Sequence, residues 1–330
     1  MRLNSGSIDE ETPRGRDQFV TRQTSAGVMA GSHPITRRRF GIGMVLMGMA
    51  TQLPAEPRPQ RIVSTAPSIT EALFALGLGG QVVGVSRYCD FPPEVEKLPK
   101  VGSYIKPDVE AIARLSPDLV ILQRSSAELT NRLNALHIAF VEVPHGTLND
   151  VYTGIEIIAK AAGVPERAVG VTGKIKGDLD AIEVRAKALP SPSVLVIADR
   201  RQGTLMDLIA IGPDNYVNQI LQIAGGRNVL AKAGLPQYPR ISMETVLREN
   251  PDVILDLSGE QKSETEREAA RAATLELWRQ NAELTAVRVG RVYVGTSNAL
   301  LVPGPRTPEA AQRLFDYIHG PANQRTGKQS

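Results

Sequence analysis

The residue types that most often bind metals or form disulfides are few and scattered in this 330-residue sequence. Its histidines are His33, His137, His145 and His319, and its one cysteine is Cys89. A zinc or manganese site needs several such ligands close together, so we expect no metal site, with His145 a solvated loop residue and Cys89 a small packed one. A single cysteine also excludes a disulfide within the chain.

The motifs of common enzyme classes are also missing from the sequence. It has no G-x-S-x-G nucleophile elbow. The stretch LGLGG at 76–80 ends a predicted helix and does not follow a strand, which is the wrong place for a phosphate loop. No carboxylate pair accompanies a histidine as an acid–base site would require. The sequence therefore predicts a binding protein without a cofactor, and not an enzyme.

Aromatic residues make up only 4% of the chain, so those that fall in loops beside predicted strands are informative. A tyrosine ring offers a flat apolar face with a hydroxyl group at its edge, which suits a broad amphipathic ligand. In α/β folds the loops that follow the strands usually form the ligand site. The ligand-binding candidates in these loops are Pro67, Ser68, Tyr88, Phe91, Tyr104 and Tyr238.

Polar residues in the second half of the chain add to these candidates. Asn298 could hydrogen-bond an amide group of a ligand, and Arg306 could pair with a carboxylate or a catecholate. The alternative for Arg306 is a structural role, in which it ties the last helix to its loop. Arg200 and Arg201 follow a predicted strand and would favour an anionic ligand, with a solvated surface pair as the other interpretation.

The elements that must position these loops include a phrase that occurs twice. EAIARLSPDLVIL (110–122) and ETVLRENPDVILD (244–256) share Glu, Arg and Pro-Asp at a constant spacing along the chain. In each copy the first half predicts a helix that ends before proline, and the apolar run predicts a strand buried on both faces. The spacing is too long for a solenoid repeat, so we expect two lobes of similar plan.

The rest of the chain fits this plan. Short apolar strands alternate with helices in each half, which predicts parallel sheets with helical crossovers. Ile175, Leu179 and Ile182 continue an apolar stripe on a long connecting helix. We expect an α/β fold of two Rossmann-like lobes joined by this one backbone helix, with a ligand cleft between them. The predicted segments are a leader at 1–55, lobes at 56–149 and 191–330, and a connecting segment at 150–190.

The leader carries an export pattern. In ITRRRFGIGMVLMGMA (35–50), Arg37, Arg38 and Phe40 stand before a short apolar run, as in twin-arginine export signals. This run is short for a helix that spans a bilayer, although a membrane anchor or a basic tail is an alternative. No cysteine follows the leader, so we expect no lipid anchor. The sequence predicts a soluble protein in the periplasm.

The positive charge of the chain belongs mostly to this leader. Residues 1–55 contain seven arginines against four acidic residues, and the whole chain has a net charge of +3. The remaining residues are therefore close to neutral. We expect a small-molecule ligand and no nucleic-acid partner, because no basic face is indicated.

Two stretches carry a family resemblance. RIVSTAPSITEALFALGLGGQVVGVSRYCDFPPE (61–94) and PGPRTPEAAQRLFDYI (303–318) resemble the helical-backbone periplasmic binding proteins of ABC importers, which carry cobalamin, iron–siderophores or haem. The resemblance covers about residues 58–320, and YCDFPPE is most similar to the cobalamin branch. It implies a monomer that holds cobalamin or a related corrinoid between its lobes. A cobalamin-binding member has tryptophans where this chain has Tyr104 and Tyr238, so a ferric siderophore and haem remain alternatives.

The resemblance also implies a protein partner. Each lobe would present one glutamate, Glu71 or Glu244, to an arginine pocket on the dimeric permease of an importer. Acidic residues are favoured at helix starts by the helix dipole alone, and Glu110, which matches Glu244 in the repeat, is such a residue. An exported two-lobed enzyme and a sensor that docks on a receptor are the alternatives from other functional classes.

Overall fold

The computed structural model describes residues 58–124, 127–258, 264–295 and 300–320. The predicted export signal and Asn298 lie outside these residues. Among the described residues, no helix has the length and apolar character needed to cross a membrane.

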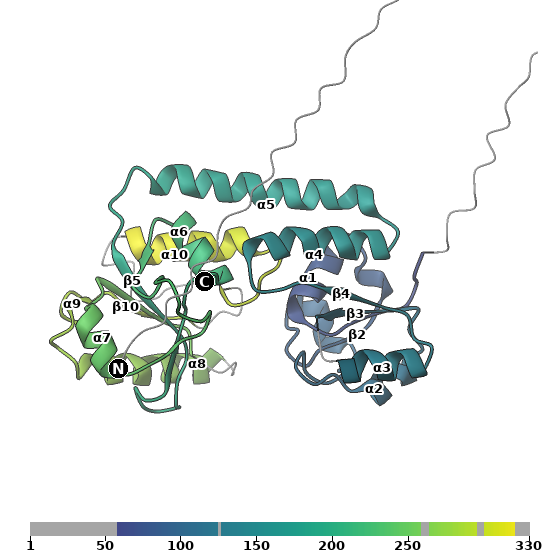
Figure 1. Cartoon of the computed structure of the whole chain (residues 1–330), viewed down its shortest axis with the longest axis horizontal. Helices are drawn as coiled ribbons and strands as arrows, with labels where there is room; N and C mark the ends of the chain where they lie inside the picture. Colours follow the sequence, from purple (N-terminus) through teal and green to yellow (C-terminus); the bar gives the residue numbers. More distant parts are fainter. Residues whose placement is uncertain (1–57, 125–126, 259–263, 296–299, 321–330) are drawn as a thin grey trace, which may run out of the picture. The chain divides into compact units, whose positions relative to one another are not determined.

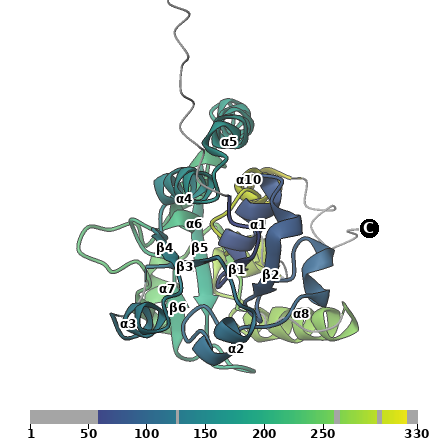
Figure 2. The same cartoon turned by 90° about the vertical axis from the view of Figure 1, so that its right-hand side faces the viewer.

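The first lobe is built on a four-stranded sheet of order β2-β1-β3-β4, in which every pairing is parallel. Its strands are β1 Ile62–Ser64, β2 Val82–Val85, β3 Leu119–Gln123 and β4 Phe140–Val143. Its helices are α1 Pro67–Ala75, α2 Val109–Arg114, α3 Ala127–Ala135 and α4 Leu148–Ala161, with short 3-10 turns at Gly79–Gln81 and Pro93–Lys97. In Figure 2, α1 and α4 lie on one side of this sheet and α2 and α3 on the other. The alternation of strands and helices predicted for this lobe is confirmed.

The second lobe has a mixed sheet of order β10-β9-β5-β6-β8, with β7 also paired to β5. Its strands are β5 Ser193–Asp199, β6 Leu208–Ala210, β7 Arg227–Asn228, β8 Arg240–Ile241, β9 Val253–Asp256 and β10 Val292–Val294. Its helices are α6 Tyr216–Ile223, α7 Met243–Glu249, α8 Glu264–Arg279, α9 Thr285–Arg288 and α10 Thr307–His319.

The parallel pairing predicted for this lobe is confirmed for β5, β7, β9 and β10, and the strands β6 and β8 depart from it. Strand β6 runs antiparallel to β5, and β8 antiparallel to β6. The loop between β5 and β6 is too short for the helical crossover that a parallel pairing would need.

The repeated phrase forms the α2–β3 unit in the first lobe and the α7–β9 unit in the second. Each helix begins with a side-chain cap, since Asp108 accepts a hydrogen bond from the amide of Ala111, and Ser242 from that of Thr245. Each helix is followed by a residue with positive φ directly before the shared proline. The values are 44° at Ser116 and 39° at Asn250.

The aspartate after that proline fastens the first strand of its lobe. The Asp118 carboxylate accepts hydrogen bonds from the amides of Gln60 and Arg61, at 2.8 and 2.9 Å. In the second lobe, the Asp252 carboxylate accepts from the amide and the hydroxyl of Ser193, at 2.8 and 2.7 Å. The Pro-Asp pair is thus repeated because each copy holds a central strand to its neighbour.

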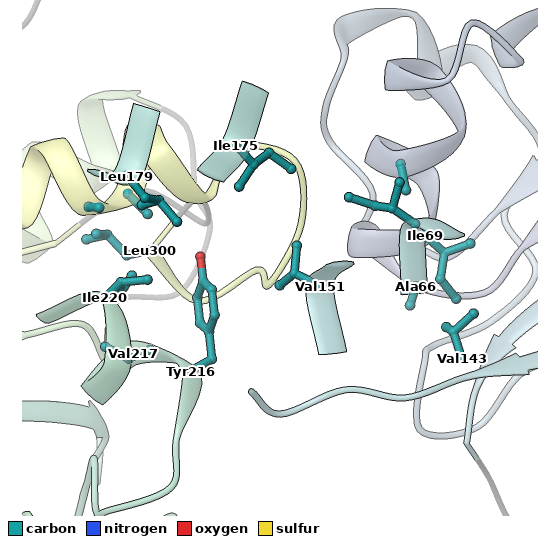
Figure 3. Close-up of a cluster of buried hydrophobic side chains, with 14 of the residues drawn as sticks. Ala66, Ile69, Val143, Val151, Ile175, Leu179, Tyr216, Val217, Ile220 and Leu300 are labelled. Atoms are coloured by element: carbon teal, nitrogen blue, oxygen red, sulfur yellow. The ribbon is translucent and has the colours of Figure 1, made fainter. Parts of the chain in front are cut away.

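The connecting segment contains the long predicted helix, α5 Pro165–Ala186, preceded by α4. Figure 1 shows α5 lying along both α4 and α10. One continuous cluster of buried apolar side chains takes in residues of α1, α4, α5, α6 and α10. In Figure 3, Ile175 and Leu179 of α5, Val151 of α4 and Ile220 of α6 lie around this junction. A packed junction of this kind permits small movements of the lobes more readily than wide opening.

Candidate functional site

Two tyrosines of the first lobe are brought together by backbone pairing beyond strand β2. The amide of Val101 donates to the carbonyl of Val85 at 2.9 Å, and that of Arg87 donates to the carbonyl of Gly102 at 2.8 Å. These bonds place the Tyr88 and Tyr104 rings side by side, with centroids 5.5 Å apart and planes inclined by 60°.

Gly102 makes this approach possible, because the backbone there is both unusual and crowded. It has φ of 89°, and a Cβ atom at this position would lie 2.7 Å from the amide nitrogen of Asp108. Only glycine combines that conformation with so close a contact.

Tyr238 of the second lobe lies close enough to Tyr104 to affect its pKa. Its loop is held by two backbone hydrogen bonds of 2.9 Å, in which the amides of Ala210 in β6 and of Gly212 donate to the carbonyls of Pro239 and Gln237. Burial raises the pKa of Tyr104, and the nearby Tyr88 and Tyr238 raise it further. We call Tyr88, Tyr104 and Tyr238 the tyrosine patch. The three side chains keep between 45% and 53% of their surface exposed.

The sequence reasoning passed over an aliphatic neighbour of this patch. Ile105 is 79% exposed, at the tip of a turn in which Ser103 and Lys106 hydrogen-bond one another. The sequence signal for it was an aliphatic residue, Ile105, directly after an aromatic one, Tyr104, in a short polar turn. Such exposure of apolar side chains suits contact with an apolar surface.

Pro67 and Ser68 lie where predicted, directly after β1 at the start of α1. Both are half-buried, and the Ser68 hydroxyl accepts a hydrogen bond from the Gln123 side chain at 3.4 Å. Gln123 is the last residue of β3. These residues therefore belong to the carboxyl edge of the first sheet, where their role as ligand contacts remains a prediction.

Arg306 is not positioned as a free cation. Its Nη2 donates to Oε1 of Glu71 at 2.5 Å, and the exposed fractions of the two side chains are 17% and 2%. Its guanidinium carbon also lies 4.1 Å from the centroid of the Phe91 ring, which is 40% exposed. Arg306 thus joins Glu71, the predicted docking residue, to Phe91, a predicted ligand contact.

Arg200 and Arg201 also have acidic partners. Arg200 pairs with the fully buried Asp256 at 2.9 Å, and Asp256 also accepts from the indole nitrogen of Trp278 at 2.9 Å. Arg201 forms an exposed ion pair with Asp207 at 2.6 Å. The buried network was missed from the sequence. Its one signal was an aspartate ending the apolar run VILD where the first copy of the phrase has leucine.

The predicted docking glutamates lie in contrasting surroundings. Glu244 is exposed in the first turn of α7. Glu71 is only 3% exposed and is held by Arg306, so it offers no free carboxylate at the surface. Glu110, the repeat match of Glu244, is exposed in the first turn of α2, where it pairs with Arg132.

Among the described residues, no group of three or more His, Cys, Asp and Glu side chains could hold a metal ion. His145 is exposed in the loop after β4. Cys89 is 4% exposed, and burial raises the pKa of its thiol to about 11. Its hydrogen bond to Thr70 and its burial make it a packed residue.

Comparison with known proteins agrees with this architecture. The model of the periplasmic binding protein family matches residues 62–299. An uncharacterized ABC transporter substrate-binding lipoprotein of Bacillus subtilis is 30% identical over 269 residues, which cover 79% of this chain and 80% of that protein. The vitamin B12-binding protein of Vibrio cholerae is 27% identical over 282 residues, covering 84% of this chain and 96% of the relative.

Solved structures with this fold include binders of different ligands. A periplasmic heme-binding protein from Roseiflexus has a TM-score of 0.69 and 28% identity, and the match covers 79% of this chain and 99% of the other. The Vibrio cholerae vitamin B12-binding protein has a TM-score of 0.65 and 25% identity, with 79% and 97% covered.

The chain therefore belongs to the periplasmic binding protein family, whose two-lobed fold it shares. It is a substrate-binding protein of the ABC-importer class that includes the cobalamin, haem and siderophore carriers. Its homologues are binding proteins and not enzymes.

Proposed function

We propose that this chain is the monomeric, periplasmic carrier of cobalamin or a related corrinoid for an ABC importer. The observation that supports this ligand most is the tyrosine patch. Three half-exposed rings from two lobes suit the broad face of a macrocycle, and their hydroxyl groups suit its polar edge. Relatives that bind vitamin B12 match the chain over most of its length.

The three arginines singled out from the sequence do not select an anionic ligand. Haem and ferric siderophores carry carboxylates or catecholates, which arginines recognise well. Arg200, Arg201 and Arg306 each have an acidic partner already, so none of them is free for such a group. A corrinoid presents mainly neutral amides around its ring, so its binding depends less on such pairing. Some structural relatives bind haem, so haem is the ligand to test in competition with the corrinoid.

The test is mass spectrometry under native conditions and calorimetry on residues 56–330, with cyanocobalamin, haem and a ferric catecholate siderophore in parallel. We expect a one-to-one cobalamin complex and weaker binding of the other two. Tyr104→Ala should weaken cobalamin binding by about tenfold or more, since a packed aromatic contact is typically an anchor. Leu136→Ala, which truncates a side chain 51% exposed at the end of α3, is the matched control. Preferred binding of haem or siderophore would reject the corrinoid.

For the permease, we infer docking through the two repeat-equivalent glutamates, Glu110 and Glu244. Both are exposed in the first turn of a capped helix, one in each lobe, whereas Glu71 is buried. Charge reversal of each to Lys should abolish transport while ligand binding survives, because exposed charges fix docking register more than ligand contact. Glu166→Lys, in the first turn of α5, controls for the helix dipole. Unchanged transport would instead support a receptor partner, as in a sensor.

Export by the twin-arginine route is the remaining part of the proposal. The double replacement Arg37→Lys and Arg38→Lys should leave the protein in the cytoplasm. Arg39→Lys, which lies between Arg38 and Phe40 of the pattern, should not. Cell fractionation measures the outcome. Recovery of a chemically altered ligand from the purified protein would favour the exported-enzyme alternative.

A further inference from the structure

The ion pair between Glu71 and Arg306 joins elements of different lobes. Glu71 lies in α1 of the first lobe, and Arg306 directly precedes α10, 235 residues further along the chain. Arg306 donates to Glu71 at 2.5 Å, and the two side chains are largely buried. The turn before Arg306 packs on the same carboxylate, because a Cβ atom on Gly304 would lie 3.2 Å from Glu71 Oε2.

This pair is poorly arranged for stability alone. Within the described residues, Glu71 Oε2 and Arg306 Nε are buried without a hydrogen-bond partner. Burial raises the pKa of Glu71, and the hydrogen bond and charge of Arg306 do not cancel that effect. Burial disfavours the Arg306 cation, yet the hydrogen bond and charge of Glu71 still raise its pKa. A buried pair with unused hydrogen-bonding groups stabilises little compared with apolar packing, so a role in fixing geometry is the better explanation.

The same guanidinium also contacts the loop that carries part of the tyrosine patch. Arg306 lies 4.1 Å from the centroid of the Phe91 ring. Phe91 closes the loop that begins at Tyr88, and Tyr88 touches Tyr104. Next to Arg306, Thr307 accepts a hydrogen bond from the Tyr216 hydroxyl at 3.2 Å, which anchors this turn within the second lobe. One residue of the second lobe thus holds both a helix and a candidate ligand loop of the first.

We propose that Arg306 is a positioning residue and not a ligand contact. Together with Glu71 and Phe91 it forms a latch between the lobes, which fixes their relative geometry before ligand arrives and couples the Tyr88–Phe91 loop to that geometry. The coupling to ligand rests on the proposed function, whereas the fixing of the lobes does not. The latch consists of two contacts of Arg306: the ion pair with the Glu71 carboxylate and the cation–π contact with the Phe91 ring.

Distances between spin labels in the ligand-free protein test the latch directly. Labels at Asn131→Cys in α3 and Glu283→Cys before α9 would report the separation of the lobes, since both positions are exposed. Cys89 should stay unlabelled because it is buried and the pKa of its thiol is raised to about 11. We expect a narrow distance distribution that broadens in Glu71→Gln and in Arg306→Met. Arg313→Met, which breaks the α10 pair with Glu309, should leave it narrow. Unchanged distributions in both latch variants would overturn the proposal.

A double variant separates positioning from stability. Arg306→Met alone should lower the melting temperature by roughly 6–10 °C, because it leaves a buried carboxylate unpaired. Glu71→Leu with Arg306→Met should recover most of that loss while the distance distribution stays broad and cobalamin binds about tenfold more weakly. A double variant with narrow distances and unchanged affinity would show that apolar packing alone sets the geometry. If the unaltered protein bound no cobalamin, the proposed ligand would fail, but the spin-label result would still decide the latch.

Discussion

The two copies of the repeated phrase form nearly the same structure and end in different chemistry. In both lobes a capped helix ends in a residue of positive φ, and an aspartate after proline fastens a neighbouring strand. The last residues of the two phrases, which lie in the following strands, differ. Leu122 of β3 is buried in an apolar cluster, whereas Asp256 of β9 is buried in an ion pair with Arg200.

This difference distinguishes the residues that build the fold in both lobes from those that are particular to one lobe. The aspartates that recur in both lobes hydrogen-bond the start of a neighbouring strand, so they are needed wherever the αβ unit joins a sheet. Positions at the carboxyl edges of the sheets differ between the lobes. There the first lobe presents Tyr88 and Tyr104, and the second uses Arg200, Asp256 and Trp278 to order the loop after β5. Ligand choice should follow these edges and not the repeated core.

The largest effect is expected where the two units differ. Asp256→Ala should lower the free energy of unfolding by about 3–5 kcal/mol, because it leaves the Arg200 cation buried without its partner. Leu122→Ala at the matching position should cost about 2–5 kcal/mol through a cavity. Urea denaturation followed by circular dichroism measures both. Adding Arg200→Met to Asp256→Leu should restore much of the stability, since it makes the second lobe resemble the first. A double variant no more stable than Asp256→Ala would contradict this account.

A smaller effect is expected at the shared aspartates. Asp252→Asn should lower the free energy of unfolding by about 1 kcal/mol, because it weakens the bonds to Ser193. Asp118→Asn should cost a similar amount in the first lobe. Fluorescence of Trp278, the one tryptophan of the chain, reports the second lobe selectively. If the free energy of unfolding measured by Trp278 fluorescence fell as much in Asp118→Asn as in Asp252→Asn, the two lobes would unfold together.

The Asp252 contribution should also depend on pH. The hydrogen bonds from the Ser193 side chain and amide lower the pKa of Asp252 below its ordinary value of 3.8. The folded chain then binds this proton less tightly than the unfolded chain, so the stabilisation is complete above that value and fades as the pH falls below it. In denaturation curves between pH 6 and pH 3, the free energy of unfolding of the wild type should approach that of Asp252→Asn as the pH falls. A constant difference would exclude a carboxylate effect.

The smallest effect is expected at the residues of positive φ, and it should differ between the lobes. Ser116→Gly should raise the free energy of unfolding by about 0.5–1 kcal/mol, because glycine adopts φ of 44° without strain. Asn250→Gly should give no gain, since asparagine tolerates this conformation and its side chain accepts a hydrogen bond from the Thr285 amide at 2.8 Å. Thermal melts of both variants measure this. Equal gains would show that the Thr285 bond contributes nothing.

Local chemistry explains why much of the fold could be predicted. The duplicated phrase, the prolines and the periodic apolar residues act over a few positions, so they fixed both αβ units and the long helix α5. The antiparallel strand β6 was not predicted in this way, because its three residues, Leu208–Ala210, are too few to give a clear apolar pattern.

For the site, the sequence by itself determined the residue types and the loops in which they lie. Tyr88 and Tyr104 could be chosen because scarce aromatics followed predicted strands. Only the tertiary structure decided the partners of the charges. Arg306 and Glu71 were assigned separate roles from the sequence, yet they form one buried pair. Such a pairing joins residues far apart in the chain, and its energy comes from burial and geometry that exist only after the lobes have packed together.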